Sequence, residues 1–135
     1  MTPRFLLDTN IIIYIRRKRP KDVLARFAEM SAGEAVMSVV THGELAYGVE
    51  KSMDPRAIEV LQELVELIPV IALPPRAGTI YGTLRADLAR RGQMIGGNDL
   101  WIATHAMCEN LSLVTNNEQE FRRVPGLVLA NWVTA

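Results

Sequence analysis

An aspartate stands between two apolar runs near the start of this sequence. Phe5, Leu6 and Leu7 precede Asp8, and the largely apolar run Ile11–Ile15 follows shortly after it. A carboxylate in such surroundings is costly to bury unless it is hydrogen-bonded, paired or bound to a metal. Because α/β proteins bind ligands at the carboxyl ends of their parallel strands, Asp8 is a candidate site residue.

Short apolar segments alternate with longer segments of helical character along the whole chain. The predicted strands are Arg4–Leu7, Ala35–Ser38, Val70–Leu73, Leu111–Thr115 and a small edge strand at Leu127–Leu129. The predicted helices are Ile11–Arg17, Lys21–Met30, Thr41–Lys51, Pro55–Leu67, Arg76–Arg91, Leu100–Cys108 and Glu118–Arg122. This alternation predicts an α/β fold with a parallel sheet covered on both faces. No linker or repeat divides the chain, so a single domain over residues 1–135 is expected.

Composition narrows the class of protein. Apolar residues make up 49% of the 135 residues, too many for a disordered chain, yet no run reaches the length of a membrane span. A single cysteine, Cys108, fits a reducing compartment, and with no signal-type N-terminus we expect a cytoplasmic protein. Cys108 and His105, on an apolar helix, are interpreted as core residues, His105 with its polar atoms satisfied.

The formal net charge is zero, but the basic residues are unevenly distributed. Arg16, Arg17, Lys18 and Arg19 are consecutive, and Lys21 follows closely. Such a cluster can attract phosphates although the whole chain is neutral. It can equally be a solvated loop after a helix, and the sequence leaves both interpretations open. Arg85, Arg90 and Arg91 are further candidates for contacts with phosphate.

Glu44 and Asp99 are the other two acidic residues with small or apolar neighbours. Thr41 and Glu44 have the spacing of a helix capping box, but Glu44 can also face the same sheet end as Asp8. Asp99 follows Gly96, Gly97 and Asn98 at the start of an apolar helix, with Asn98 as a possible cap. The helix dipole alone would favour a carboxylate there, and burial of the helix would direct Asp99 into the sheet-end crevice.

Three carboxylates at one sheet end would repel one another without a cation. Mg²⁺ and Mn²⁺ prefer oxygen ligands, and such ions can activate water and stabilise phosphoryl oxygens. Together with the basic cluster, this favours phosphodiester hydrolysis. Thr115 and Asn117, after the fourth strand, can hydrogen-bond a metal-bound water. Glu120 is the nearest additional acid, although a surface position on a short helix explains it as well.

The motifs Leu7–Asn10, Glu44–Gly48, Ile95–Ala103 and Leu113–Asn117 together resemble those of PIN-domain ribonucleases, and more narrowly VapC-type toxins of type II toxin–antitoxin modules. The segments Glu120–Leu127 and Asn131–Trp132 also resemble that family's C-terminal pattern. The resemblance covers nearly the whole chain and implies an α/β/α sandwich. It also implies a Mg²⁺- or Mn²⁺-dependent endoribonuclease that cuts RNA, commonly tRNA, and thereby inhibits translation and growth.

The resemblance further implies roles for individual residues and partners. Asp8, Glu44 and Asp99 match the acidic metal-site positions, and Thr9 and Thr115 match supporting polar positions. Asn10 matches the residue after the first motif and is a further supporting candidate. Asn117 stands where the family often has another acid, so a second metal ion would need Glu120 or the substrate phosphate to compensate. A homodimer and a VapB-type antitoxin that covers the active site are expected. A non-catalytic binding module, a DNA nuclease and a phosphatase are the competing interpretations.

Overall fold

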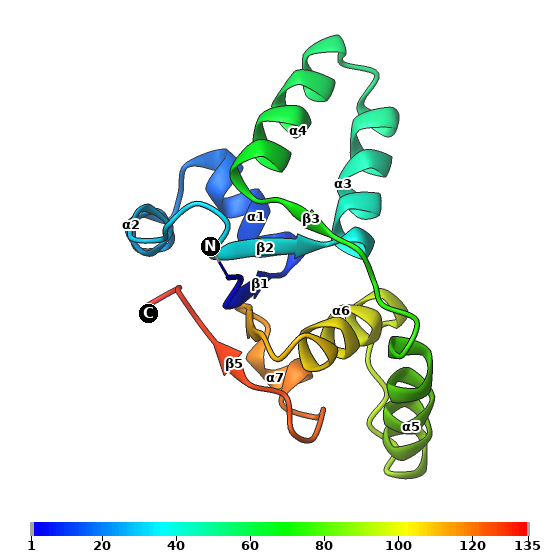
Figure 1. Ribbon diagram of the computed structural model, residues 1–135. Helices are drawn as coiled ribbons and strands as arrows, with labels where there is room; N and C mark the ends of the chain where they lie inside the picture. Colours follow the sequence, from blue (N-terminus) through cyan, green and yellow to red (C-terminus); the bar gives the residue numbers. More distant parts are fainter. Residues whose placement is uncertain (1, 135) are drawn as a thin grey trace.

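A five-stranded parallel sheet organises the molecule (Figure 1). In the computed structural model, which describes residues 2–134, the spatial order of the strands is β3-β2-β1-β4-β5. Neighbouring strands pair in parallel throughout; Leu6, for example, is in register with Val36 on one side and Leu113 on the other. The bounds are β1 Phe5–Leu7, β2 Ala35–Ser38, β3 Val70–Ile71, β4 Ser112–Val114 and β5 Leu129–Ala130.

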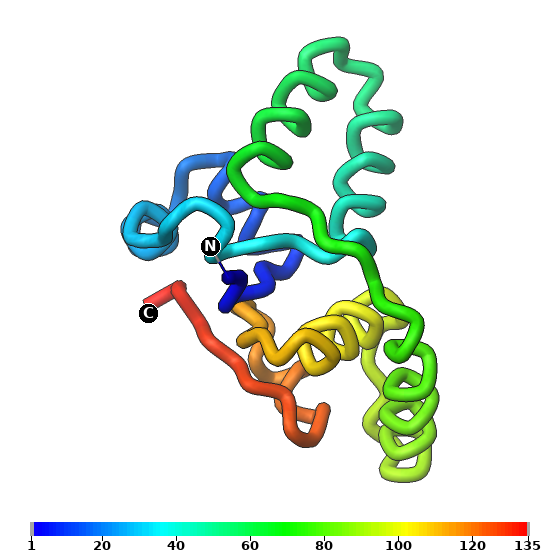
Figure 2. Tube along the Cα trace, in the orientation of Figure 1, coloured from blue at the N-terminus to red at the C-terminus, as the bar shows by residue number. Residues whose placement is uncertain are grey.

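Seven helices connect these strands within the described part of the chain. They are α1 Thr9–Arg17, α2 Lys21–Ala28, α3 Val39–Ser52, α4 Pro55–Leu67, α5 Ala77–Arg90, α6 Gly97–Cys108 and α7 Glu118–Phe121. In residues 2–134 none of them combines the length and hydrophobicity that a membrane crossing requires. The α3–α4 hairpin extends away from the sheet, and α5 extends in a different direction (Figure 2).

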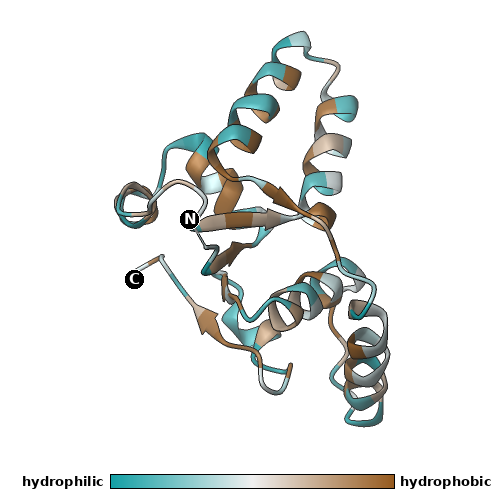
Figure 3. Cartoon of the chain, in the orientation of Figure 1, coloured by the Kyte–Doolittle hydropathy of each residue, from teal (hydrophilic) through white to brown (hydrophobic). Residues whose placement is uncertain are grey.

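Two separate hydrophobic cores lie on the two faces of the sheet. Alternate residues of a strand point to opposite faces, so Leu7 and Met37 join one core with α1, α2 and α4. Leu6 and Val36 join the other, with α5, α6 and α7. The strands are correspondingly apolar, whereas most helices mix polar and apolar surfaces (Figure 3). This arrangement confirms the predicted three-layer α/β/α sandwich.

The predicted strands and helices are all present, with shifted ends. Helix α3 begins two residues earlier than predicted, because Ser38 rather than Thr41 caps it: Ser38 Oγ accepts a hydrogen bond from the Val40 N–H at 3.1 Å. Helix α6 begins at Gly97, after Gly96, so the suggestion that Asn98 caps it is wrong. The edge strand lies at Leu129–Ala130 instead of Leu127–Leu129, where it pairs with Leu113 and Val114.

The core interpretation of His105 is correct only in part. Its ring is fully buried, and Nδ1 lies 2.7 Å from Ser38 Oγ. Within residues 2–134, Nε2 makes no hydrogen bond of good geometry, although the Ala72 backbone interacts with the ring and acts to raise its pKa. Burial lowers the pKa of His105, so the ring is neutral near pH 7. The contact joins the N-terminus of α3 to α6, the two helices that carry Glu44 and Asp99. Cys108 is buried as expected.

The order of the strands places a crevice beside β1. From β1 the chain proceeds to β2 and β3 on one side, then returns to β4 and β5 on the other. The reversal therefore lies between β1 and β4, and parallel α/β sheets bind ligands outside the carboxyl ends of the strands at such a point. Asp8 and Thr115 are the residues that directly follow these two strands.

Candidate functional site

Asp8 occupies the carboxyl end of β1 and caps α1. Its side chain is 5% exposed. Oδ1 accepts a hydrogen bond from the Ile11 N–H at 2.9 Å, and Oδ2 accepts one from Thr115 Oγ1 at 2.5 Å. Burial raises the pKa of Asp8 even though both of these hydrogen bonds act to lower it, and the nearby charge of Glu44 raises it further. Asp8 is therefore a buried carboxylate whose two oxygens are each fixed by a hydrogen bond.

Glu44 contacts α1 and does not cap its own helix. Its Oε1 accepts a hydrogen bond from Thr9 Oγ1 at 2.6 Å, and Thr9 Oγ1 lies 3.3 Å from the hydroxyl of buried Thr41. The capping-box interpretation of Thr41 and Glu44 is thus wrong, because the early start of α3 places both residues inside the helix. Glu44 instead projects toward the start of α1, next to Asp8.

Asp99 lies in the first turn of α6, facing Glu120. Gly96 lies beside both carboxyl groups: a Cβ at that position would be in ordinary contact with them, 3.5 Å from Asp99 Oδ2 and 3.8 Å from Glu120 Oε1. Burial raises the pKa of Asp99 to about 7, together with the charge of Glu120 and a hydrogen bond to it. Glu44 and Asp8 contribute to the same rise, so the four carboxyl groups share one electrostatic environment.

Glu120 lies partly exposed on the short helix α7, as the alternative interpretation held, and its side chain is also part of this cluster. Its Oε1 accepts a hydrogen bond from the Gly96 N–H at 3.0 Å, and its Oε2 accepts one from Asn117 Nδ2 at 2.6 Å. Burial acts to raise the pKa of Glu120, but these hydrogen bonds and the one shared with Asp99 outweigh it and lower the pKa. Within the pair, Asp99 is therefore the group whose pKa is raised and Glu120 the group whose pKa is lowered.

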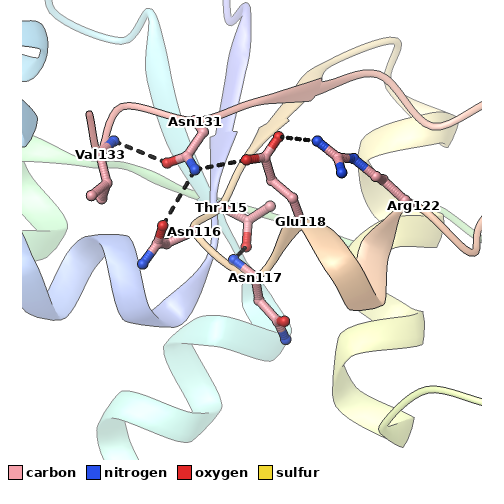
Figure 4. Close-up of polar contacts among 7 residues, drawn as sticks. All are labelled: Thr115, Asn116, Asn117, Glu118, Arg122, Asn131 and Val133. Carbon is pink, nitrogen blue, oxygen red and sulfur yellow. Dashed lines mark hydrogen bonds and ion pairs between the residues drawn. The ribbon is translucent and has the colours of Figure 1, made fainter. Parts of the chain in front are cut away.

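The loop after β4 is held between the C-terminal segment and the cluster (Figure 4). Thr115 Oγ1 accepts a hydrogen bond from the Asn117 N–H at 2.9 Å while donating to Asp8. On the other side, Asn131 Nδ2 donates to Glu118 Oε2 at 2.9 Å and to Asn116 Oδ1 at 3.3 Å. In Figure 4 the Asn117 side chain points away from Asn131. The loop thus directs Asn117 toward Glu120.

Asn131 is a residue of this scaffold that sequence reasoning did not assign to the site. Its Oδ1 accepts a hydrogen bond from the Val133 N–H at 2.9 Å, which fixes the amide so that its NH₂ group faces the β4 loop. Its position in the sequence could have indicated this role, because Asn131 directly follows the edge strand β5, which pairs with β4. A polar residue at a strand end next to Thr115 is a candidate for contact with the loop.

The structure does not bring the basic cluster to the carboxylates. Arg16, Arg17, Lys18 and Arg19 are exposed at the C-terminal end of α1, whereas Asp8 caps its N-terminus. At a rise of 1.5 Å per residue, these ends are roughly 13 Å apart, too far for a contact with the same phosphate group. Asn10 is exposed in the first turn of α1, on the same side of the sheet as Asp8.

A pocket of about 660 Å³ opens next to the cluster. Thr9 and Glu44 line it on the side of the carboxylates, and the remaining lining residues come from α3 and α6: Val39, Val40, Gly43, Tyr47 and Asn98. It contains no lysine or arginine. The pocket therefore extends the site along α3 without adding positive charge.

The donor set fits a hard divalent cation. Asp8, Glu44, Asp99 and Glu120 offer carboxylate oxygens alone, with threonine hydroxyls and an amide beside them. Mg²⁺ needs only one or two carboxylates because it keeps several waters. Among residues 2–134 no three of these acids already surround one point as ligands. Burial, and after it the charges of Glu120, Glu44 and Asp8, raise the pKa of Asp99, and a bound cation would favour its ionised form.

Comparison with known proteins identifies the family. The PIN domain matches residues 5–127. The chain belongs to the PIN domain family. Members of this family generally depend on divalent metal ions, in agreement with the oxygen donors of the site.

Curated relatives of this PIN domain match over nearly their whole length. It is 41% identical to Ribonuclease VapC2 of Haemophilus influenzae over 131 residues, covering 96% of this chain and 98% of that protein. It is 42% identical over 130 residues to the tRNA(fMet)-specific endonuclease VapC of Shigella flexneri, with the same coverage.

Solved structures of the family agree with the fold of this PIN domain. The DNA-bound VapBC complex from Salmonella typhimurium contains a chain with a TM-score of 0.90 at 36% identity, covering 97% of this chain and 99% of that one. A VapBC-1 structure from nontypeable Haemophilus influenzae gives a TM-score of 0.89 at 35% identity, covering 99% and 100%. The whole sandwich, including its C-terminal segment, is therefore shared.

Proposed function

We propose that this PIN domain is a divalent-metal-dependent endoribonuclease that acts as the toxin of a type II toxin–antitoxin system. The observation that carries the proposal is the convergence of four carboxyl groups, Asp8, Glu44, Asp99 and Glu120, outside the strands where the sheet reverses direction. The high identity to relatives named ribonuclease and endonuclease supports it.

Each acidic residue has a role in this proposal. Asp8 and Asp99 are metal ligands, and Glu44, oriented by Thr9, completes the metal site directly or through water. When bound, Mg²⁺ or Mn²⁺ would activate a water and offset charge at the scissile phosphate. Thr115 keeps Asp8 ionised and oriented. Glu120 provides the acidic charge that Asn117 lacks, and the 2.6 Å hydrogen bond from Asn117 supports this role because it holds Glu120 toward Asp99.

The proposed substrate is RNA, with tRNA as the first candidate because one relative is named a tRNA(fMet)-specific endonuclease. The basic residues Arg16, Arg17, Lys18 and Arg19 would then contact backbone phosphates away from the cleavage point, which fits their position at the far end of α1. Arg85, Arg90 and Arg91 on and after α5 are secondary candidates. Asn10 would support the site from the first turn of α1.

The proposed protein partner is a VapB-type antitoxin, since solved relatives are VapBC complexes. An uncompensated acidic cluster favours a basic group from a partner, because charge pairing reduces the cost of holding these carboxylates together. The proposal includes a homodimer and action in the cytoplasm, where tRNA is available.

The first test compares substrate classes with and without metal. Purified, antitoxin-free protein is incubated with tRNA, single-stranded DNA and a small phosphate ester in Mg²⁺, Mn²⁺ or EDTA. We expect discrete tRNA fragments only with metal. Cleavage of DNA or ester at rates equal to RNA would contradict the RNase assignment. A folded protein that leaves all three intact would instead support a non-catalytic binding module.

A further inference from the structure

We propose that Tyr47, together with Val39, Val40 and Asn98, forms a binding subsite for one nucleobase next to the scissile phosphate. The proposal rests on the RNase function proposed above and adds a residue that recognises substrate. Tyr47 is the most exposed aromatic side chain in the described part of the chain, at 67% exposure. An aromatic ring so exposed beside a carboxylate cluster has no role in packing the core.

One face of α3 carries both the cluster and the subsite. Val40, Glu44 and Tyr47 follow one another at helical spacing and line the same pocket. His42, Ala46 and Glu50 of α3 line a separate groove shared with α4, and Tyr47 is not among its lining residues. Tyr47 therefore does not hold the α3–α4 hairpin together. It lies one turn beyond Glu44, about 4.5 Å further from the sheet along the helix axis.

The space around Tyr47 is open on the side of the cluster. Gly43 and Gly48 flank it on the helix, and a Cβ on either glycine would meet nothing within 4 Å. A planar ligand can thus approach the ring without displacing a neighbouring side chain. Tyr81 and Trp101, by contrast, stack on each other with their ring centroids 3.8 Å apart, so those two ring faces are not available to a ligand.

The chemistry of the lining fits a neutral base better than a phosphate. The pocket has no cationic side chain, whereas Val39, at 43% exposure, and Val40 give it an apolar wall. Asn98 is exposed and can offer both a donor and an acceptor to a base edge. Proteins recognise single-stranded RNA by this combination of aromatic stacking and polar contacts to base edges.

The test uses Tyr47→Leu, which keeps an apolar side chain but removes the stacking surface, with Tyr47→Phe as the matched control. Both changes are made in the wild type for cleavage and in Asp8→Asn for binding without turnover. Loss of one base-stacking contact should raise the KM or Kd for RNA by about 5- to 150-fold in Tyr47→Leu. Tyr47→Phe should remain within about twofold of its parent.

A spectroscopic readout separates stacking from a general structural effect. Short RNAs carrying 2-aminopurine at successive positions are titrated with the Asp8→Asn proteins. We expect quenching at one position with Tyr47 and Tyr47→Phe, and its loss with Tyr47→Leu. Equal quenching and equal KM in all three would overturn the proposal. Unchanged RNA binding with lost VapB-type antitoxin binding would overturn it as well, and assign Tyr47 to a protein interface.

Different results would refute the RNase function and the base subsite. If the wild type cleaves RNA and Tyr47→Leu matches it, only the base subsite is refuted. If no RNA is cleaved with any metal, the RNase proposal is refuted. The 2-aminopurine titration still decides the subsite in that case, because it needs no turnover.

Discussion

Thr115 Oγ1 donates a hydrogen bond to Asp8 Oδ2 at 2.5 Å and thereby joins the carboxyl ends of two neighbouring strands, β1 and β4. The two residues are 107 positions apart in the sequence. The bond supports the charged form of a buried carboxylate, since without it the desolvated Asp8 would hold a proton more tightly. The β4 loop and the proposed metal ligand are therefore one structural unit.

Replacing Thr115 by valine removes this donor and keeps the shape of the side chain. The free energy of unfolding should fall by about 1–3 kcal/mol, because a buried acceptor loses its partner. The pKa of Asp8 should rise further, so the pH–rate profile should shift to higher pH. Urea denaturation and cleavage rates check both effects. Thr83→Val, at an exposed threonine that donates to its own helix, should change neither.

Ser38→Ala tests the connection between α3 and α6. The change removes the cap of α3 and the partner of His105 Nδ1. We expect the free energy of unfolding to fall by about 1–3 kcal/mol and cleavage to weaken, because these helices carry Glu44 and Asp99. Ser52→Ala, at the exposed C-terminal end of α3, is the matched control and should cost less than half as much. Equal losses for both serines would contradict the connection.

Asp99→Asn tests the charge of the cluster through its pH dependence. Asp99 titrates at about 7 in the folded protein and near 3.8 when unfolded. Between these values the folded state binds more protons, so the free energy of unfolding decreases as pH rises through this window. Without metal, the variant should be more stable than wild type above pH 7, by about 1–2 kcal/mol once solvent screening is allowed for.

Urea denaturation in EDTA at several pH values measures this difference. The difference between the wild-type and Asp99→Asn curves should stop changing with pH only below 3.8, where the carboxyl group is protonated in both the folded and the unfolded state. If the free energies of unfolding of the two proteins depend on pH in the same way from acid to neutral pH, the pKa of Asp99 is not raised in the folded protein, and the prediction is contradicted.

Much of the fold follows from local sequence. The apolar segment Phe5–Leu7 and the helical spacing of Pro55–Leu67 predict their elements because period and burial are local properties. The ends of α3 and α6 were less predictable. Ser38 and Thr41 are both good caps, and only pairing of Ser38 in β2 and the contact of its hydroxyl with His105 select the first.

The residues of the site likewise fall into those that local sequence predicts and those whose positions depend on distant parts of the chain. Asp8 and Asp99 were predictable because each follows a strand end or opens an apolar helix. The position of Glu120 was not, because it depends on a hydrogen bond from Gly96, 24 residues earlier in the chain. Asn131 depends likewise on how the C-terminal segment packs against the β4 loop. The metal-binding and catalytic roles remain predictions.

Asn117→Asp tests whether Glu120 replaces a missing acid. The new carboxylate would lie where Asn117 now donates to Glu120 at 2.6 Å, so the hydrogen bond becomes a repulsion. The metal-free protein should be destabilised by about 1 kcal/mol, and the affinity for Mn²⁺ should increase. Thermal shift with and without Mn²⁺ measures both, because ligand binding to the folded state raises the Tm. Asn116→Asp, on the other side of the loop, is the control.

The central claim is that the carboxylate cluster cleaves RNA. The most direct measurement is the single-turnover rate of tRNA cleavage in Mn²⁺ by Asp8→Asn, which keeps the size of the side chain, beside Glu63→Gln, a change at an exposed acid of α4. We expect Asp8→Asn to fold and to lose at least about 100-fold in rate, a large effect for loss of one metal ligand, while Glu63→Gln matches wild type. A folded Asp8→Asn protein that cleaves within about twofold of wild type would contradict the account.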